Sequence, residues 1–177
     1  MNTRDLTNIL RNKVKSGIHL LGVLASDQLP KKVIDYVPAV AIINTEPSTM
    51  GGEHWLAVFI NKNREGFFFD SYGRKASYRG FPRDINDFLR KNCTRVYHST
   101  KKVQADTSTV CGQHCVFFIL HIQRGLSYQK VIDMYKNNVY CNDAMVCKFV
   151  DRIQPVIFMR CNRQYFPCIQ CAHVRYI

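Results

Sequence analysis

The sequence lacks any long uncharged apolar run, which excludes a membrane-spanning helix, because such a helix needs about 20 consecutive apolar residues. Residues 1–5 lead into a polar segment rather than into the apolar centre of a secretion signal. Internal repeats, low-complexity runs and linkers rich in proline, glycine or serine are also absent. We therefore expect a soluble, intracellular protein without a membrane partner, folded as one domain over residues 1–177.

Acidic residues are scarce: 13 Asp and Glu stand against 25 Lys and Arg, and the formal net charge is +12. This charge favours a polyanion as partner, with nucleic acid the leading candidate, and a solvated basic surface is the alternative. The basic residues are spread out, and zinc-finger, RNA-recognition and basic-zipper signatures are missing, which favours phosphate contacts independent of base sequence. The candidate nucleic-acid contacts are Arg74, Lys75, Lys101 and Lys102.

Cysteine is abundant, with eight residues, but without a secretion signal these thiols do not indicate a disulfide framework. Residue types that bind zinc do occur near the C-terminus, as Cys161, Cys168, Cys171 and His173. Their spacing does not match a common zinc finger, so packing or an exposed redox pair is the favoured explanation. We therefore predict mostly reduced thiols, no metal site and no required cofactor.

Hydrophobic patterning predicts an α+β fold with a central mixed sheet flanked by helices. Stretches that are apolar on both faces predict buried strands, and apolar residues at helical spacing predict helices. The predicted strands cover residues 37–44, 54–60, 67–70 and 94–97. The predicted helices cover residues 4–15, 82–92 and 111–124, followed by one helix capped by Ser127 and another capped by Asn142.

Cys111 is the candidate nucleophile. It precedes Gly112 at a predicted helix start, where the positive end of the helix dipole favours the thiolate and lowers the thiol pKa. A thiol nucleophile also needs a base, and His54 opens a predicted strand beside an accessible loop. Asp70 closes the next strand, so pairing of the two strands through the turn at residues 61–66 would place Asp70 beside the His54 imidazole.

Gln104 is the candidate oxyanion donor. It precedes Cys111 in a short loop, so its side-chain amide can turn back and, with the Cys111 backbone N–H, stabilise the oxyanion formed on attack. His114 lies on another side of the helix and is not the expected base, and Cys115 is expected to face the core. Each residue alone is more often structural than catalytic, so the prediction depends on the ordered set.

Five segments of the chain form a recognisable pattern: Ala-Ile-Ile-Asn-Thr at 41–45, Gly-Gly-Glu-His-Trp at 51–55, Phe-Asp-Ser-Tyr-Gly at 69–73, Val-Gln at 103–104 and Cys-Gly at 111–112. This pattern resembles that of the adenovirus maturation proteases, the adenains. The resemblance implies a papain-like, adenain-like cysteine protease fold with His54, Asp70, Gln104 and Cys111 as catalytic residues. Adenains usually have Glu at the position of Asp70, whereas the related SUMO-deconjugating proteases have Asp there.

The resemblance also implies substrates, stimulators and a location. It implies an endopeptidase that processes precursor proteins of a virus or virus-like mobile element after small residues, in the host nucleus or the virion. It further implies stimulation by DNA and by a short basic peptide that forms a disulfide with Cys93. The alternative for Cys93 is an ordinary cysteine at the edge of a strand. Two other hypotheses stand beside it: a deconjugating protease for ubiquitin-like proteins, and an inactive nucleic-acid-binding protein with the same fold.

Overall fold

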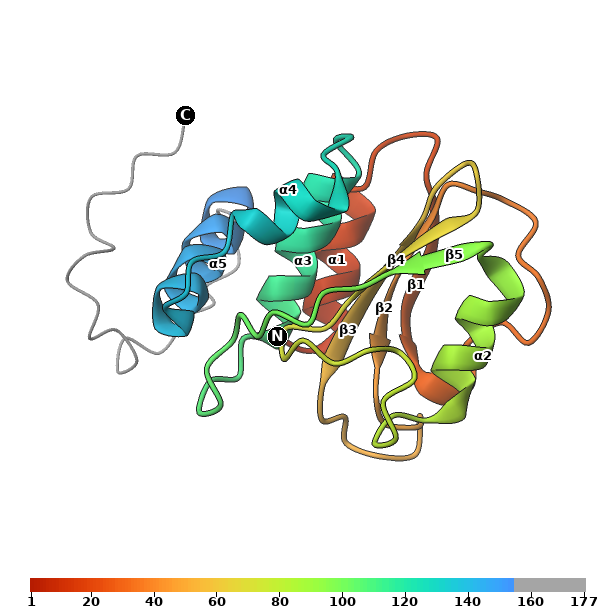
Figure 1. The fold of residues 1–177 in the computed structure, drawn as a ribbon, viewed down its shortest axis with the longest axis horizontal. Coiled ribbons are helices and arrows are strands. Elements are labelled where there is room, and N and C mark those ends of the chain that lie inside the picture. Colours follow the sequence, from red (N-terminus) through yellow and green to blue (C-terminus); the bar gives the residue numbers. More distant parts are fainter. Residues whose placement is uncertain (155–177) are drawn as a thin grey trace.

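The computed structural model describes residues 1–154, in which helices cover both faces of a five-stranded mixed sheet (Figure 1). The strands are β1 (His19–Ala25), β2 (Ala39–Asn44), β3 (Trp55–Ile60), β4 (Glu65–Phe69) and β5 (Arg95–Tyr97). The helices are α1 (Thr3–Lys13), the short 3₁₀ helix η1 (Ser26–Gln28), α2 (Arg83–Asn92), α3 (Cys111–Ile122), α4 (Tyr128–Asp133) and α5 (Val139–Ile153). This architecture confirms the predicted α+β fold with a flanked mixed sheet.

The five strands lie in the sheet in chain order. β1 and β2 are parallel, β2, β3 and β4 are antiparallel in succession, and β4 and β5 are parallel. In the β3–β4 hairpin Ala57 pairs with Phe69, so the residues just before β3 lie beside the residues just after β4. The hairpin therefore decides which side chains meet at this edge of the sheet.

Apolar clusters cover both faces of β2. Val40 and Ile42 pack in a cluster with α1, α3, α4 and α5, whereas Ala41 and Ile43 pack in a second cluster with α2. Figure 1 shows α2, with the short η1 beside it, on one side of the sheet and α1, α3, α4 and α5 on the opposite side. Burial on both faces explains why the strand is apolar at every position from Ala39 to Ile43 rather than at alternate positions.

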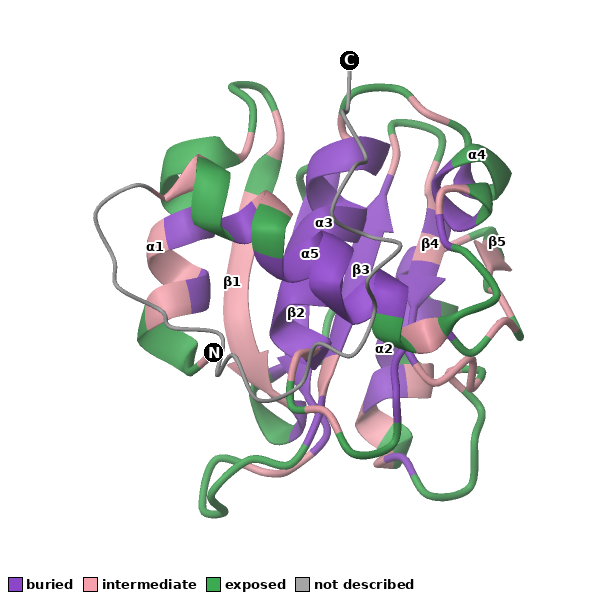
Figure 2. Ribbon diagram, turned by 90° about the vertical axis from the view of Figure 1, so that its left-hand side faces the viewer, coloured by how far each residue is buried: buried purple, intermediate pink, exposed green. Residues whose placement is uncertain are grey.

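Helix α3 is the central helix of the larger layer, and all of its residues from Cys111 to Ile122 are buried. Figure 2 shows α3, β2 and β3 buried along most of their length, whereas β1 is only half-buried. The helix packs between β3 on one side and α5 on the other. Its first residue is therefore held at a fixed position against the end of the sheet.

Two sequence-based assignments differ from the structure. Strand β1 was not predicted, because it is mostly half-buried and bends at a register shift between Leu20 and Gly22, so no clean alternation appears. The last helix is capped by Asn138, whose side chain accepts from the backbone N–H groups of Tyr140 and Cys141. The assignment of that cap to Asn142 was wrong, because Asn142 is buried inside the helix.

The C-terminal candidates Cys161, Cys168, Cys171 and His173 lie outside the described residues. Within residues 1–154, no helix is long and apolar enough to cross a membrane. The same part of the chain contains no group of three or more His, Cys, Asp or Glu side chains arranged to hold a metal ion.

Candidate active site

His54 and Asp70 meet at the open end of the β3–β4 hairpin. His54 immediately precedes β3 and Asp70 immediately follows β4. The His54 Nε2 atom lies 2.7 Å from Asp70 Oδ1, and both residues are buried. The strand pairing thus brings together the two side chains that the sequence pattern placed at neighbouring strand ends.

Cys111 begins α3 and is hydrogen-bonded to His54. Burial alone would raise the pKa of the Cys111 thiol, but the hydrogen bond to His54 and the charge of its ring lower it below the ordinary value. Burial would likewise lower the pKa of His54, but the hydrogen bonds with Asp70 and Cys111 raise it. The two opposite shifts favour a thiolate beside an imidazolium.

The second oxygen of Asp70 binds Arg74. Arg74 Nε donates to Asp70 Oδ2 at 2.7 Å, and the Arg74 backbone N–H donates to the same oxygen at 3.0 Å. The glycine turn between them, with Gly73 at φ 73°, lets the chain fold back over the carboxylate. Burial would raise the pKa of Asp70, but the hydrogen bonds from His54 and Arg74 keep it below its ordinary value. Asp70 is therefore held ionised.

Aromatic rings surround this ion pair. The Arg74 guanidinium lies 5.0 Å from the Tyr72 ring centroid, 5.4 Å from that of Tyr78 and 4.7 Å from that of Phe81. The Tyr72 ring also contacts the His54 ring, with centroids 5.0 Å apart. Sequence reasoning missed these roles and assigned Arg74 to nucleic acid, although an arginine four residues after the candidate acid, across a glycine turn, was a usable signal.

Gln104 is buried and is fixed at both ends of its amide. Its Oε1 accepts from Ser71 Oγ at 2.7 Å, and its Nε2 donates to the Ser108 carbonyl at 2.9 Å. The other Nε2 hydrogen has only a long contact of 3.4 Å with the Tyr72 hydroxyl, whose ring lies against His54. One Nε2 hydrogen is therefore held by Ser108, and the other has only this long contact and can be donated to a reacting group.

The neighbours of Cys111 on α3 behave as the sequence pattern predicted. His114 is fully buried, and its Nε2 atom lies 2.8 Å from Asp143 Oδ1. The ring is thus paired with Asp143 and is not the base that acts on the Cys111 thiol. Cys115 faces the core, where its thiol donates to the Trp55 carbonyl at 3.3 Å, and burial raises its pKa well above the ordinary value. Of these side chains, only His54 is hydrogen-bonded to the Cys111 thiol.

A cavity of about 440 Å³ lies beside the start of β3. Its wall includes the loop residues Gly51, Gly52 and Glu53, which directly precede His54, together with Trp55. Gly52 has φ 81°, and a Cβ atom there would lie 2.5 Å from Asn44 Nδ2, so no larger residue fits without displacing that side chain. The cavity is thus lined by the residues on either side of His54 in the chain.

In the described part of the chain, the remaining candidates form no hydrogen bond or ion pair with His54, Asp70 or Cys111, although the Lys102 ammonium lies 5.8 Å from the Tyr72 ring centroid. Cys93 caps the end of α2, with its thiol against Gly66 of β4, and burial raises its pKa to about 11. Lys75 and Lys102 are exposed, and Lys102 forms an ion pair with Asp106 at 2.5 Å. The Lys101 ammonium instead donates to the Tyr135 carbonyl.

A model of the adenovirus endoprotease family matches residues 20–166. The chain belongs to the adenovirus endoprotease family. Among individual family proteins, the chain is 30% identical to the protease of Porcine adenovirus A serotype 3 over 109 residues, which are 53% of each chain. It is 31% identical to the protease of Human adenovirus B serotype 3 over 108 residues, or 55% of this chain and 47% of that protein. The chain thus spans about half the length of these curated relatives.

Solved structures confirm the adenovirus endoprotease fold at lower sequence similarity. The ASFV pS273R protease superposes with a TM-score of 0.60 at 17% identity, over 86% of this chain and 67% of that chain. ChlaDub1 from Chlamydia trachomatis superposes with a TM-score of 0.50 at 15% identity, over 86% of this chain and 75% of that chain. Family membership and fold agree with the resemblance found in the sequence motifs.

The shifted pKa of Cys111 predicts alkylation at unusually low pH. Iodoacetamide modifies thiolates, so Cys111 should react at a pH where an ordinary thiol, with a pKa of about 8.5, is protonated. His54→Ala removes the hydrogen bond and the charge that lower the pKa, and should move the alkylation profile to higher pH. Peptide mass spectrometry measures this, with Cys93 as the unreactive control thiol. If Cys111 shows the same alkylation profile against pH in the wild type and in His54→Ala, the assignment of Cys111 and His54 as a pair is wrong.

The hydrogen bonds from Arg74 to Asp70 predict that part of the folding stability depends on pH. The pKa of Asp70 is below its ordinary value of 3.8, so ionised Asp70 stabilises the fold above that pH, and this contribution is lost as the pH falls through the lowered pKa. Arg74→Gln removes hydrogen bonds to a charged group, each of which contributes about 1.5–3 kcal/mol. We expect lower stability at pH 7 and acid unfolding at a higher pH, measured by circular dichroism. Arg79→Gln, at an exposed residue nearby, should change neither.

Proposed function

We propose that this chain is a cysteine endopeptidase in which Cys111 attacks the carbonyl carbon of a peptide bond. The observation that carries the proposal is the line of contacts from Asp70 to His54, at 2.7 Å, and from His54 to the Cys111 thiol. Since Asp70 occupies Nε2 of the ring, Nδ1 is the nitrogen left for the thiol. This arrangement provides a nucleophile, a base and a group that orients the base.

The proposed reaction proceeds through a thioester. His54 takes the thiol proton, and the Cys111 sulfur forms a bond to the carbonyl carbon, whose oxygen becomes an oxyanion. The Cys111 backbone N–H and Gln104 Nε2 stabilise that oxyanion. When the carbon–nitrogen bond breaks, His54 gives its proton to the leaving amine. His54 then takes a proton from water, which hydrolyses the thioester and releases the free thiol, while Asp70 remains ionised throughout.

The substrates we propose are precursor proteins of a virus or a virus-like element, cleaved after small residues during particle maturation in the host nucleus or the virion. Family membership supports this substrate class. The cavity beside Gly51 and Gly52 supports an extended substrate, because it gives a peptide room next to the loop that carries His54. A deconjugating protease for ubiquitin-like proteins is the second candidate, favoured by Asp70 at the place where adenains usually have Glu.

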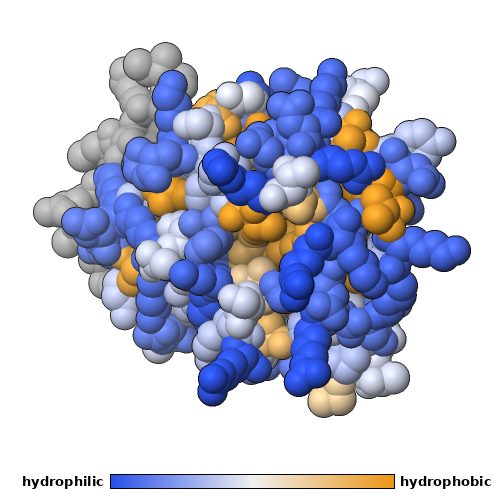
Figure 3. All heavy atoms as spheres, turned by 45° about the vertical axis from the view of Figure 1, so that its right-hand side comes forward, coloured by the Kyte–Doolittle hydropathy of each residue, from blue (hydrophilic) through white to orange (hydrophobic). Residues whose placement is uncertain are grey.

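We further propose nucleic acid as a stimulator. The net charge of +12 supports it, together with exposed lysines such as Lys75 and Lys102. Figure 3 shows that one face of the molecule is covered mainly by hydrophilic side chains, with apolar residues in small separate groups. Such a surface suits contacts to phosphates that do not depend on base sequence.

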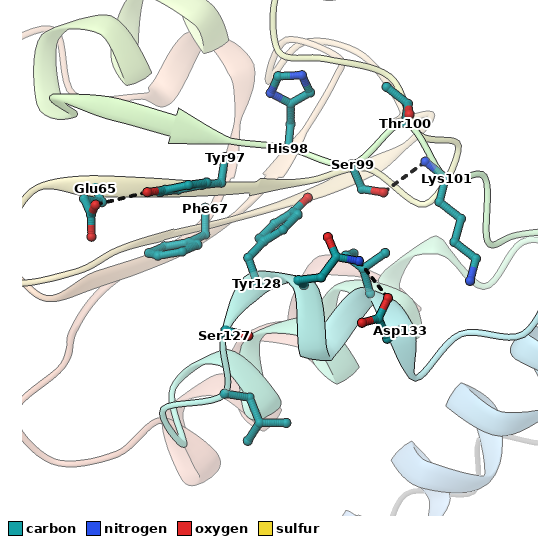
Figure 4. A pocket seen from close by; sticks show the side chains of 13 residues that line it. Glu65, Phe67, Tyr97, His98, Ser99, Thr100, Lys101, Ser127, Tyr128 and Asp133 are labelled. Carbon is teal, nitrogen blue, oxygen red and sulfur yellow. Dashed lines mark hydrogen bonds between the residues drawn. The ribbon is translucent and has the colours of Figure 1, made fainter.

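A disulfide-linked basic peptide is the other proposed stimulator. Cys93 lies at the end of α2, two residues before β5, which is an edge strand in the described sheet. A cavity of about 820 Å³ lies between Tyr97 of β5 and Tyr128 of α4, and supports a place for an added peptide (Figure 4). Burial raises the pKa of Cys93 to about 11, which disfavours the thiolate that forms a disulfide. A bound peptide must therefore first loosen the packing of the Cys93 thiol against Gly66.

The proposal predicts loss of peptide cleavage when the nucleophile or the oxyanion donor is removed. Cys111→Ala should abolish turnover, and Gln104→Ala should lower kcat by about 100-fold to 1,000-fold, as loss of one oxyanion donor does elsewhere. A fluorogenic precursor-derived peptide, tested with and without duplex DNA, measures this.

Asn12→Ala, at an exposed amide residue on α1, is the matched control and should cleave normally. A wild-type chain that is inactive in every condition would support the inactive nucleic-acid-binding alternative. Strong labelling of Cys111 by a ubiquitin-like probe that ends in Gly-Gly would instead support the deconjugating candidate.

The nucleic-acid proposal predicts steep salt dependence. If several lysines and arginines contact phosphates, the affinity for duplex DNA should fall as the salt concentration rises. A plot of the logarithm of the affinity against the logarithm of the salt concentration should have a slope of roughly −0.9 for each phosphate neutralised. Fluorescence anisotropy between low and physiological salt measures the slope, and Lys75→Ala should reduce it by about one contact. An affinity that does not change with salt would show that the charge serves solubility.

A further inference from the structure

Two consecutive residues of α5 contact the backbone on either side of Gln104. Asn142 Nδ2 donates to the Val103 carbonyl at 3.1 Å. Asp143 Oδ2 accepts from the Ala105 N–H at 3.3 Å. The helix therefore holds the peptide groups that flank the candidate oxyanion donor, although it lies almost 40 residues further along the chain.

Both α5 side chains are themselves held in one orientation. Asp143 directs its other oxygen, Oδ1, to His114 Nε2 at 2.8 Å, and His114 lies on α3 three residues after Cys111. Asn142 accepts from the Lys136 N–H at 2.8 Å and donates to the Lys136 carbonyl at 3.0 Å. His114, Asn142 and Asp143 are at most 7% exposed, so water does not replace these contacts easily.

The opposite side of the Gln104 segment is held by the sheet. The Ser71 carbonyl accepts from the N–H groups of Val103 at 2.8 Å and Gln104 at 3.2 Å. Ser71 directly follows Asp70, so this side of the segment moves with the end of β4. The Val103 residue is thus bonded through its N–H to the turn after β4 and through its carbonyl to α5.

We propose that Asn142 and Asp143 are positioning residues that place Gln104 Nε2 for the oxyanion, with His114 linking them to the helix that carries the nucleophile. The inference rests on the proposed function, because it assigns Gln104 as the donor. Oxyanion donors stabilise the transition state only when they are held at the position of the developing charge, and a displacement of about 1 Å can cost roughly 100-fold in rate. Burial lowers the pKa of His114, which favours the neutral ring in its contact with Asp143.

Asp143→Ala separates positioning from damage to the nucleophile. We expect kcat for peptide cleavage to fall by about 10-fold to 100-fold, with KM changed little, because the amide of Gln104 is displaced. Alkylation of Cys111 by iodoacetamide forms no oxyanion, so its rate should stay within about twofold of wild type. Asp143→Asn should recover much of kcat, because the amide can still accept from Ala105 while His114 adopts its other tautomer.

Two further measurements make the test independent of protease activity. Hydrogen exchange at the Ala105 amide should accelerate in Asp143→Ala and stay slow in Asp151→Asn, an exposed acidic residue on the same helix. A wild-type chain that cleaves no peptide overturns the proposed function, and exchange at Ala105 still decides whether α5 holds the segment.

Three results overturn the positioning proposal. The first is equal loss of cleavage and of Cys111 alkylation in Asp143→Ala. The second is unchanged kcat in a variant that circular dichroism shows to be folded. The third is unchanged exchange at Ala105. If Asp143→Ala does not fold, Asn142→Ser carries the same comparison, because it removes the donor to Val103 and keeps Asp143 in place.

Discussion

The buried carboxylate of Asp70 is the interaction on which the rest of the site depends. Its side chain is inaccessible to solvent, so every charge on it must be compensated inside the protein. His54 supplies one partner and Arg74 another, and the backbone N–H groups of Tyr72 and Arg74 complete the set. The same contacts that keep Asp70 ionised also fix the ring of His54, which in turn sets the state of the Cys111 thiol.

Secondary structure brings these groups together without long loops. The β3–β4 hairpin positions the base and its carboxylate, and α3, enclosed by β3 and α5, brings the thiol to them. Complete burial of α3 leaves its axis little freedom, since protein interiors are closely packed. The rigid parts of the fold therefore carry the nucleophile and the base, while the segment around Gln104 needs separate support from the sheet and from α5.

Much of this arrangement was predictable from local patterns. The two-sided apolar character of β2 and β3 indicated a sheet covered on both faces, and the placement of His54 and Asp70 at neighbouring strand ends indicated their contact. Strand β1 escaped detection because Gly22, at the register shift, interrupts its apolar residues, and this mostly half-buried edge strand shows no alternation. Asn142 was misread as a cap because its residue type favours helix starts, and only its burial shows a different role.

The sequence by itself determined the α+β class, the central strands, the buried helix behind Cys111 and the identity of the candidate catalytic set, because periodicity and local order record which faces are buried. Only the tertiary structure decided two contacts that support this set, those of Asn142 and Asp143 with the backbone beside Gln104. These two contacts join residues 38 and 39 positions apart. Such hydrogen bonds depend on how helices pack in three dimensions, and no local spacing in the chain encodes that packing.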